Sequence, residues 1–215
     1  MAVELRKLIN PTNEELDEAA RIAAQAFQDD VFTGIFLGGN WDLLFPFCKC
    51  VVQAQNIAGE NVVAVADGKF VGLAGWFPPG SLFLGSPDQA EAAGWNDFVS
   101  KMTPELTDWW MKYFLPSHER LIINAFGDPG FKKDVWNLQT LCVLPEYRRR
   151  GIGRSLVKAK ENEIIASSPG QAIVLESEVE ENTKMYKRWG FDVQGTLHIE
   201  SYIGECEMWC LYKKF

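Results

Sequence analysis

The sequence predicts an α/β (α+β) fold in which a mixed central sheet is flanked by helices. A strand, a glycine turn, a helix and a second strand follow one another between residues 136 and 177. This order is typical of a right-handed crossover between parallel strands. Earlier in the chain, two apolar runs flank Asp67-Gly68, which predicts an antiparallel hairpin. A sheet that contains both kinds of pairing is mixed.

The remaining elements follow from periodicity and from turn residues. Thr12 and Glu15 form a capping-box pattern at the start of the first helix. The expected helices are 12–27, 41–58, 151–167 and 182–189, and the expected strands are 3–9, 61–66, 69–77, 136–143, 172–177, 192–201 and 205–212.

A long segment, residues 79–134, separates the hairpin from the next strand, and we expect helices at 87–101, 104–115 and 119–126. The favoured interpretation is a packed helical cap whose aromatic residues form core, and the alternative is a lid with an aromatic wall. Because no repeat or linker interrupts the chain, we expect one domain over 1–215 with this segment inserted in it. Its aromatic residues include Trp95, Phe98, Trp109, Trp110, Tyr113 and Phe114.

The overall charge argues against two classes of partner. The net charge is −8 and the pI is about 4.9, which disfavours general binding to nucleic acid or to an anionic membrane. Basic residues nevertheless cluster between 148 and 160, and such a local patch suits a small polyanion. No apolar run approaches the ~18 residues of a membrane span, and the start of the chain lacks a secretion signal. We therefore expect a soluble, cytoplasmic protein; the sequence leaves the oligomeric state open.

The five cysteines do not predict a metal site, since their number is odd and no spacing suits zinc. Free thiols in a reducing compartment are the expected state. Cys142 could be a covalent nucleophile, but its neighbours are apolar and no His is near it in sequence. We expect neither a metal nor an acyl-enzyme.

The stretch Arg148-Arg149-Arg150-Gly151-Ile152-Gly153 lies between a strand and a helix that begins near Arg154 and Ser155. Glycines allow backbone N–H groups to converge on one point, and a helix N-terminus adds partial positive charge there. Arginine can also bind phosphate oxygens in a forked geometry. The pattern predicts a site for a phosphate-rich small molecule.

R-x-x-G-x-G directly after a strand that ends L-x-V-x-P resembles the acetyl-coenzyme A signature of the GNAT superfamily of N-acetyltransferases. The resemblance implies the GNAT acyl-CoA N-acyltransferase fold, with acetyl-CoA as cosubstrate bound by residues 148–155. In that family the strand before the loop splays from its parallel neighbour, and the pantetheine arm lies between them. Main-chain atoms of Leu141, Cys142 and Val143 would bond that arm, and an N–H near Val143 could hold the oxyanion.

A second pattern, Asn182, Tyr186, Gly190 and Phe191, also resembles the family. It implies that Asn182 contacts the pantetheine arm and that Tyr186 protonates the departing thiolate. The chemistry is reasonable because a tyrosine, with a pKa near 10, stays protonated at pH 7. The alternative is that Tyr186 only packs its ring.

The acceptor amine must lose a proton before it attacks, and carboxylates are candidates for this step. Among the acidic residues at the end of the strand 172–177, Glu176 is our candidate for the base that removes this proton. Asp29, Asp30 and Phe32 lie in the loop that borders the acceptor site in the family. Together with the aromatic segment, they favour a small, partly hydrophobic primary amine that attacks directly in a ternary complex.

Several alternatives remain open or fail on detail. A dinucleotide-binding fingerprint lacks its third glycine, since Leu156 stands there, and a Walker A motif lacks its G-K-[ST]. A protein or peptide N-acetyltransferase and a catalytically silent acyl-CoA sensor both remain possible on the same fold.

Overall fold

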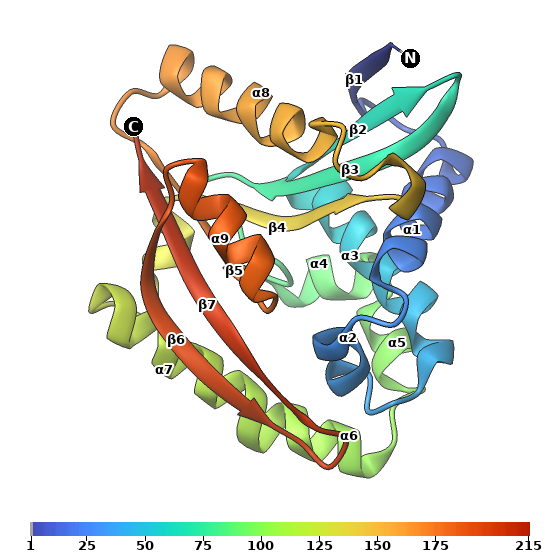
Figure 1. Cartoon of the computed structure of the whole chain (residues 1–215). Helices are drawn as coiled ribbons and strands as arrows, with labels where there is room; N and C mark the ends of the chain where they lie inside the picture. Colours follow the sequence, from blue (N-terminus) through green and yellow to red (C-terminus); the bar gives the residue numbers. More distant parts are fainter. Residues whose placement is uncertain (1) are drawn as a thin grey trace.

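The computed structural model describes residues 2–215, which form a seven-stranded sheet with helices on both faces (Figure 1). The mixed sheet and its flanking helices confirm the predicted fold class. The strand order is β1-β2-β3-β4-β5-β7-β6. The strands are β1 (Val3–Lys7), β2 (Glu60–Ala66), β3 (Lys69–Phe77), β4 (Trp136–Val143), β5 (Ala172–Ser177), β6 (Asp192–Glu200) and β7 (Glu205–Lys214).

The α-helices lie before β2, between β3 and β4, and on either side of β5. They are α1 (Asn13–Phe27), α2 (Val31–Phe36), α3 (Leu44–Ala58), α4 (Pro87–Ala92), α5 (Trp95–Val99), α6 (Pro104–Trp109), α7 (Leu115–Phe126), α8 (Ile152–Ser167) and α9 (Glu180–Arg188). Short 3₁₀ turns occur at Trp41–Leu43, Phe131–Asp134 and Pro145–Tyr147.

The pairing between β4 and β5 positions the site. These strands are the parallel pair of the sheet, and they pair only at Trp136 with Ile173 and at Asn137 with Val174. Beyond those residues the strands diverge. One leaf of the sheet, β1 to β4, is antiparallel, and so is the other, β5-β7-β6. The opening between β4 and β5 is therefore the junction between the two leaves (Figure 1).

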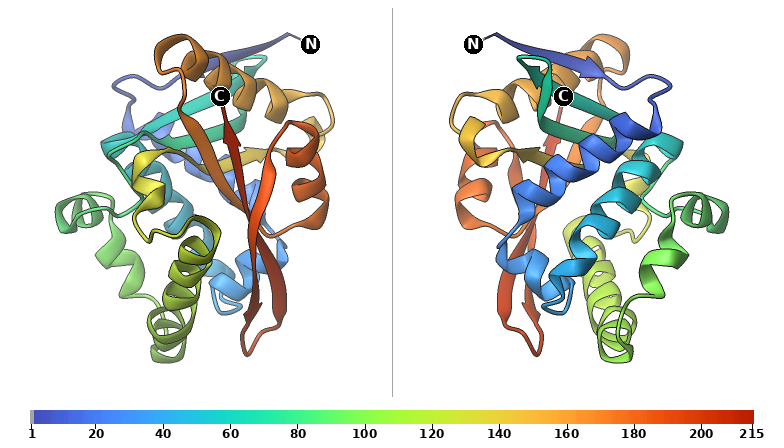
Figure 2. Two further views of the ribbon diagram at one scale, coloured as in Figure 1. Left: turned by 90° about the vertical axis from the view of Figure 1, so that its left-hand side faces the viewer. Right: turned by 90° about the vertical axis from the view of Figure 1, so that its right-hand side faces the viewer.

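Each face of the sheet has its own core, because strand side chains alternate between the faces. On one face, α8 and α9 cover Leu175 and Ile173. On the other, α1, α3 and segment 79–134 cover Val174 and Cys142. Figure 2 shows these layers from both sides, with the helices of segment 79–134 grouped below the β1–β4 leaf.

Three local differences from the predicted elements have physical causes. Residues 31–36 form α2 instead of a loop, because Asp30 caps it by accepting from the Thr33 N–H at 2.8 Å. The helix expected at 87–101 breaks into α4 and α5 at Gly94, whose φ is +79°. Residues 116–118, expected to separate two helices, belong to α7, which begins at Leu115 directly after a π-helical turn, Trp110–Phe114, that joins it to α6; Pro116 is therefore helical. Proline is tolerated there because it occupies the first turn of α7.

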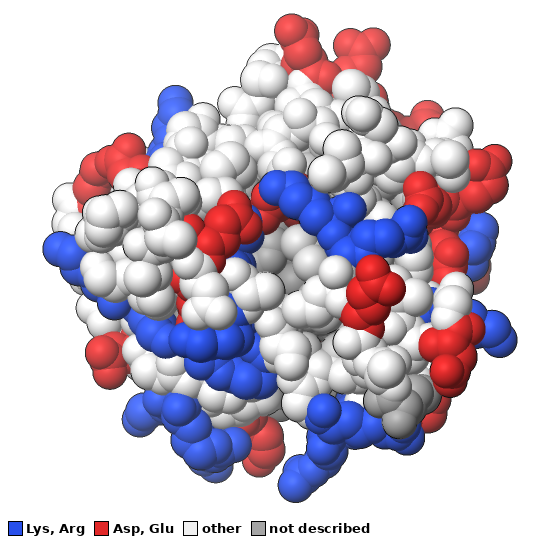
Figure 3. Space-filling model, turned by 90° about the horizontal axis from the view of Figure 1, so that it is seen from above, with Lys and Arg blue, Asp and Glu red and all other residues white. Residues whose placement is uncertain are grey.

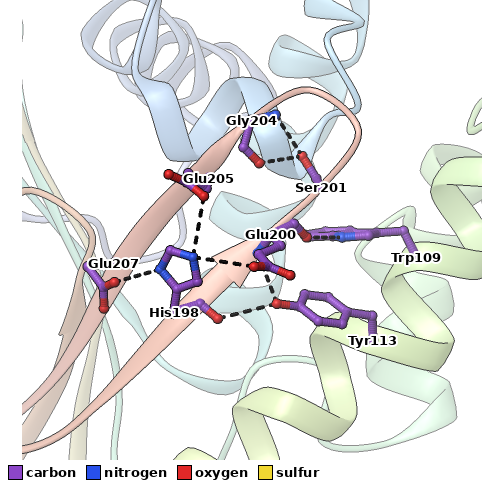
Figure 4. Close-up of polar contacts among 8 residues, drawn as sticks. All are labelled: Trp109, Tyr113, His198, Glu200, Ser201, Gly204, Glu205 and Glu207. Atoms are coloured by element: carbon purple, nitrogen blue, oxygen red, sulfur yellow. Dashed lines mark hydrogen bonds and ion pairs between the residues drawn. The ribbon is translucent and has the colours of Figure 1, made fainter.

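Segment 79–134 also contacts the β6–β7 hairpin (Figure 4). The Trp109 Nε1–H donates to the Glu200 carbonyl at 2.8 Å. The Tyr113 hydroxyl accepts from the Glu200 N–H at 2.9 Å and donates to the His198 carbonyl at 3.3 Å. α7 packs along β6, so this segment connects the two leaves of the sheet below their opening.

Within residues 2–215, no helix combines the length and the apolar character needed to cross a membrane.

Candidate active site

The free edge of β4 faces the opening. The Leu144 N–H donates to the Val71 carbonyl at 2.9 Å, so Cys142 and Leu144 are the residues whose backbone groups bond to β3. Leu141 and Val143 therefore turn their N–H groups toward the opening. The Val143 carbonyl accepts from Nε of Arg148 at 3.1 Å. Of the three residues expected to bond an extended ligand, Leu141 and Val143 are suitably oriented, and the backbone of Cys142 is used by β3.

A β-bulge in β4 also contributes to this edge. Gly75 pairs with Thr140 and Trp76 pairs with Leu138, so Gln139 has no partner in β3. Gln139 is exposed, although β4 lies in the middle of the sheet. A bulge turns a side chain away from its regular direction and is common beside active sites. Gln139 consequently lines the cavity described below.

The glycine loop makes an anion-binding turn at the start of α8. Arg149 and Gly151 have φ values of +61° and +80°, so two of the three residues from 149 to 151 adopt the left-handed conformation and the backbone turns sharply. No side chain caps α8, which leaves the N–H groups of Ile152, Gly153 and Arg154 available at its positive end. These features fit a phosphate ligand. Viewed from above, Lys and Arg side chains lie on either side of a hollow in this face (Figure 3).

The basic side chains of the loop differ in what they contact. Arg148 bonds to the carbonyl of Ala26 at 2.8 Å as well as to Val143, so it ties the end of β4 to the end of α1. Arg150 bonds to the Glu146 carbonyl, and Arg154 pairs with the buried Glu161 at 3.0 Å. Arg148 therefore has a structural role, and the phosphate contacts expected from these side chains stay a prediction.

Tyr186 and Asn182 lie on α9, one helical turn apart. The Tyr186 ring is buried against Trp189 and Phe191, at centroid distances of 5.3 and 5.8 Å. Burial, together with the charge of Glu178, raises the pKa of Tyr186 above its ordinary value. The phenol therefore stays protonated over the physiological pH range. Asn182 lines the cavity.

Glu176 is held by two residues of segment 79–134. Nζ of Lys132 lies 2.8 and 2.9 Å from its two carboxylate oxygens, and Nε2 of His118 lies 3.4 Å away. Burial alone would raise the pKa of Glu176, but Lys132 and His118 outweigh burial and hold that pKa below its usual range. A carboxylate stabilised in this way is a poor proton acceptor, so the structure disfavours Glu176 as the base.

Glu178 lies two residues further along, on the same face as Glu176, and it also lines the cavity. Its pKa is raised to about 8, first by burial and then by the charges of Glu176 and Asp30. A carboxylate with a pKa near the ambient pH is a suitable general base. The sequence alone does not distinguish Glu178 from the neighbouring glutamates, because the groups that surround its carboxylate come together only in the folded chain.

A cavity of about 970 Å³ extends from the β4–β5 opening to segment 79–134. Asp30 and Phe32, two of the residues predicted to bind the acceptor, line this cavity. Asp29, by contrast, is exposed, has a φ of +64° and is not among the lining residues. Aromatic side chains of segment 79–134 line the cavity, among them Trp95, Trp110 and Phe114.

Cys142 lacks the surroundings of a nucleophile. Its side chain is buried in the core under α1, and burial raises its pKa to about 12. A thiol in this state carries almost no thiolate at pH 7.

The ligand atoms of His198, Glu200 and Glu205 lie within 4.8 Å of one another, a spacing that could suit a metal ion. These side chains are exposed on the β6–β7 hairpin, where His198 pairs with Glu207 at 2.6 Å (Figure 4). They lie outside the cavity lining.

A comparison with models of known protein families finds one match in this chain. Residues 119–193 match the model of the acetyltransferase (GNAT) domain. This match spans β4, the glycine loop, α8, β5 and α9. Residues 119–193 therefore form an acetyltransferase domain of the GNAT type. No curated protein sequence matches this chain.

Solved structures of the same fold cover nearly all of this chain. Arylalkylamine N-acetyltransferase 2 from Aedes aegypti aligns over 100% of this chain and 99% of its own, with 11% identity and a TM-score of 0.66. A protein described as histone acetyltransferase HPA2 and related acetyltransferase, from Corynebacterium glutamicum, covers 99% and 96% with 20% identity and a TM-score of 0.62. The polyamine N-acetyltransferase of Drosophila melanogaster covers both chains fully, with 12% identity and a TM-score of 0.56. At these identities the likeness shows the fold.

Proposed function

We propose that the protein transfers an acetyl group from acetyl-CoA to the primary amine of a small molecule by direct attack in a ternary complex. The observation that carries the proposal is the β4–β5 opening. The N–H groups of Leu141 and Val143 face this opening from β4, and β4 leads into the anion-binding turn of α8. On the other side of the opening, Glu176 and Glu178 at the end of β5 line the large cavity.

Acetyl-CoA would occupy the opening as an additional strand beside β4. Its phosphates would meet the N–H groups at the start of α8, with Arg149 and Gly151 shaping the turn. The N–H groups of Leu141 and Val143 would bond the pantetheine arm, and the Val143 N–H would stabilise the oxyanion as the thioester carbonyl is attacked.

Two side chains near the end of β5, Glu178 and Tyr186, handle the protons. Glu178 takes the proton of the bound ammonium, so that the amine attacks in its neutral form. Attack of the amine on the thioester carbonyl forms the C–N bond, and the C–S bond then breaks as Tyr186 donates its phenolic proton to the departing sulfur. The proton that the new amide nitrogen loses restores the Tyr186 phenol, and Glu178 releases its proton to solvent. Glu178 replaces Glu176 as the proposed base because Lys132 already pairs with Glu176.

A small acceptor is supported by the position of segment 79–134 over the cavity, between α3 and the β6–β7 hairpin. Known structures of the same fold include enzymes for arylalkylamines, polyamines and agmatine. A ribosomal-protein alanine N-acetyltransferase from Escherichia coli shares the fold as well, with a TM-score of 0.54. A peptide acceptor is therefore the second candidate.

The test is a thiol-release assay with acetyl-CoA against a panel of small amines and short peptides, run beside Tyr186→Phe. We expect release with small amines and a rate reduced by about 10²–10⁴-fold in the variant. Release with peptides alone would replace the small-molecule proposal. Tight acetyl-CoA binding in a calorimeter without release from any acceptor would instead indicate a silent acyl-CoA sensor.

A further inference from the structure

The charged side chains that line the cavity are concentrated at its β5 end. Glu178 experiences the charges of Glu176, Asp30 and Lys132, so these groups lie within electrostatic reach of one another. Lys132 neutralises Glu176 by direct contact, which leaves Asp30 and Glu178 to meet a cation. The remaining carboxylate of the lining, Glu119 on α7, is exposed.

The wall formed by α2, α3, α5 and the π-helical turn is aromatic. Phe36 lies 4.1 Å from Trp110 and 5.0 Å from Phe47, measured between ring centroids. Trp95 lies 5.4 Å from Trp110, and Phe32 lies 5.2 Å from Phe36. The Nε1–H of Trp110 is already bonded to the Phe36 carbonyl at 2.9 Å. This wall thus offers rings and hydrocarbon to a ligand and no free polar group from its central tryptophan.

The cavity thus has carboxylates at its β5 end and aromatic rings on its other wall, and this arrangement restricts which amine can fill it. A ring-containing body would gain about 1.5–3 kcal/mol by leaving water for such a wall. A second ammonium group there would lose its hydration and would find no carboxylate, and this desolvation costs several kcal/mol. A cation–π contact would return only about 2 kcal/mol of that cost.

We propose that the acceptor is a primary monoamine with a ring-containing, apolar body, and that diamines and polyamines are excluded. The amine nitrogen lies between Asp30 and Glu178, and the body lies against Phe32, Phe36 and Trp110. This inference rests on the proposed transferase function, because it assigns the acceptor of the same site.

The experiment compares three probes with the same four-carbon chain: 4-phenylbutylamine, butylamine and 1,4-diaminobutane. For each probe, kcat/KM is measured by thiol release, and binding is measured by calorimetry in the presence of coenzyme A. We expect 4-phenylbutylamine to exceed butylamine by about tenfold to a hundredfold, the range that corresponds to burial of its ring. We expect 1,4-diaminobutane to be the poorest of the three.

Substitutions at Phe32 and Met111 test whether the cavity wall sets the preference among the three amines. Phe32→Ala removes a partly buried ring and should reduce the ratio between 4-phenylbutylamine and butylamine by about tenfold, whereas Phe32→Leu should retain most of that ratio. Met111→Glu alters a cavity-lining residue that is 61% exposed, so the fold should tolerate it. The added carboxylate should raise kcat/KM for 1,4-diaminobutane relative to the wild type.

The outcomes distinguish this inference from the proposed function. Equal or better use or binding of 1,4-diaminobutane would overturn the monoamine assignment and leave the transferase function intact. Selective binding of 4-phenylbutylamine without thiol release would support the assignment and contradict the transferase. If no probe binds or reacts, the assignment is wrong, and the function is then decided by the peptide arm of the first assay.

Discussion

Glu176 lies in β5 and Glu178 directly after it, yet their surroundings shift the pKa values of the two carboxyl groups in opposite directions. Lys132 and His118 keep the first carboxylate ionised against the effect of burial. Burial and the negative charge of that neighbour raise the pKa of the second. Because the pKa of Glu176 is lowered and the pKa of Glu178 is raised, Glu176 stays negatively charged while Glu178 can titrate as a base.

Replacing the base should remove one limb of the pH profile. In the wild type, kcat/KM should rise with pH as Glu178 loses its proton, with a midpoint near its pKa of about 8. In Glu178→Gln we expect kcat/KM to fall by about 10²–10⁴-fold and this limb to disappear. Steady-state kinetics between pH 6 and 9.5 provide the measurement.

Glu176→Gln is the matched control. Removing the charge of Glu176, and freeing that of Lys132, should lower the pKa of Glu178 and move the same limb to lower pH. A limb that stays in place in Glu176→Gln and persists in Glu178→Gln would show that a different group is the base.

The ion pair of Lys132 also makes a prediction for stability. Lys132→Met leaves a mostly buried carboxylate without its main partner, and breaking such a pair costs about 3–5 kcal/mol of the free energy of unfolding at neutral pH. The folded-state pKa of Glu176 is depressed, so its stabilisation is present above the unfolded pKa and is lost as the pH falls.

Urea unfolding at pH 7 and at pH 3 checks this, and the difference between variant and wild type should shrink in acid. The control is Lys112→Met, because Lys112 pairs with Asp108 at a position where its side chain is 73% exposed. That change should cost less than about 1 kcal/mol. Equal losses in the two variants would contradict a special role for Lys132.

The sequence was informative for residues whose role depends on local pattern. The glycine turn and the spacing of Asn182 and Tyr186 are both readable within a few positions of the chain. Glu178 and Lys132 were not separable from their charged neighbours, because their pKa effects arise between β5 and segment 79–134, which are distant in sequence. The same holds for Arg148, whose partner on α1 is 122 positions away.

Among the elements, the glycine loop and α8 form the unit on which acetyl-CoA binding should depend. Gly151 has a φ of +80°, and an added Cβ would meet nothing within 4 Å. Gly151→Ala should therefore act through backbone strain, with a loss of about 1–2 kcal/mol in stability. Because relief of that strain would turn the N–H groups away from the phosphates, we expect the acetyl-CoA Kd to rise by about tenfold.

Gly170→Ala tests the other end of α8. Gly170 has a φ of +89° and equally open surroundings, so a similar loss of stability is expected, with the acetyl-CoA Kd unchanged. Calorimetric titration and urea unfolding of both variants give the comparison. A similar rise in Kd for the two variants would mean that general destabilisation, and not the loop, controls binding.

Helices and strands with regular periodicity could be predicted, while the exceptions depend on contacts. The hairpin at Asp67-Gly68 and the crossover through α8 follow from turn residues and alternation. The short helix α2 depends on a single cap, and the π-helical turn depends on packing of Trp110 against Phe36. Neither signal can be distinguished from a loop in the sequence alone.

At the scale of the whole molecule, the sheet consists of two leaves joined by two residue pairs of β4 and β5. Strand propensity predicts both strands but not how far they stay paired, so the opening became an expectation only through the family resemblance. The contacts of segment 79–134 with the β6–β7 hairpin hold the leaves together on the acceptor side (Figure 4). Some residues of this segment belong to the core on this face of the sheet, and others line the cavity.

If these contacts set the shape of the acceptor cavity, loosening them should affect the amine and spare acetyl-CoA. Tyr113→Phe removes the hydroxyl that accepts from the Glu200 N–H and donates to the His198 carbonyl. Water can replace these exposed bonds, so the free energy of unfolding should change by no more than about 1 kcal/mol. The Glu200 amide should exchange its hydrogen faster, and the KM for the amine should rise about threefold to tenfold, with the acetyl-CoA Kd unchanged.

Hydrogen exchange and steady-state kinetics measure the two effects in one preparation. Tyr202→Phe is the control. Tyr202 lies at the tip of the same hairpin and its hydroxyl donates to the Gly38 carbonyl, so its removal leaves the hydrogen bond of the Glu200 amide in place. A loss of acetyl-CoA affinity in Tyr113→Phe would mean that the segment acts on both substrates through the β4–β5 opening. Faster exchange with an unaltered KM would mean that the cavity keeps its shape without this contact, since the remaining bond from Trp109 to the Glu200 carbonyl would then be sufficient.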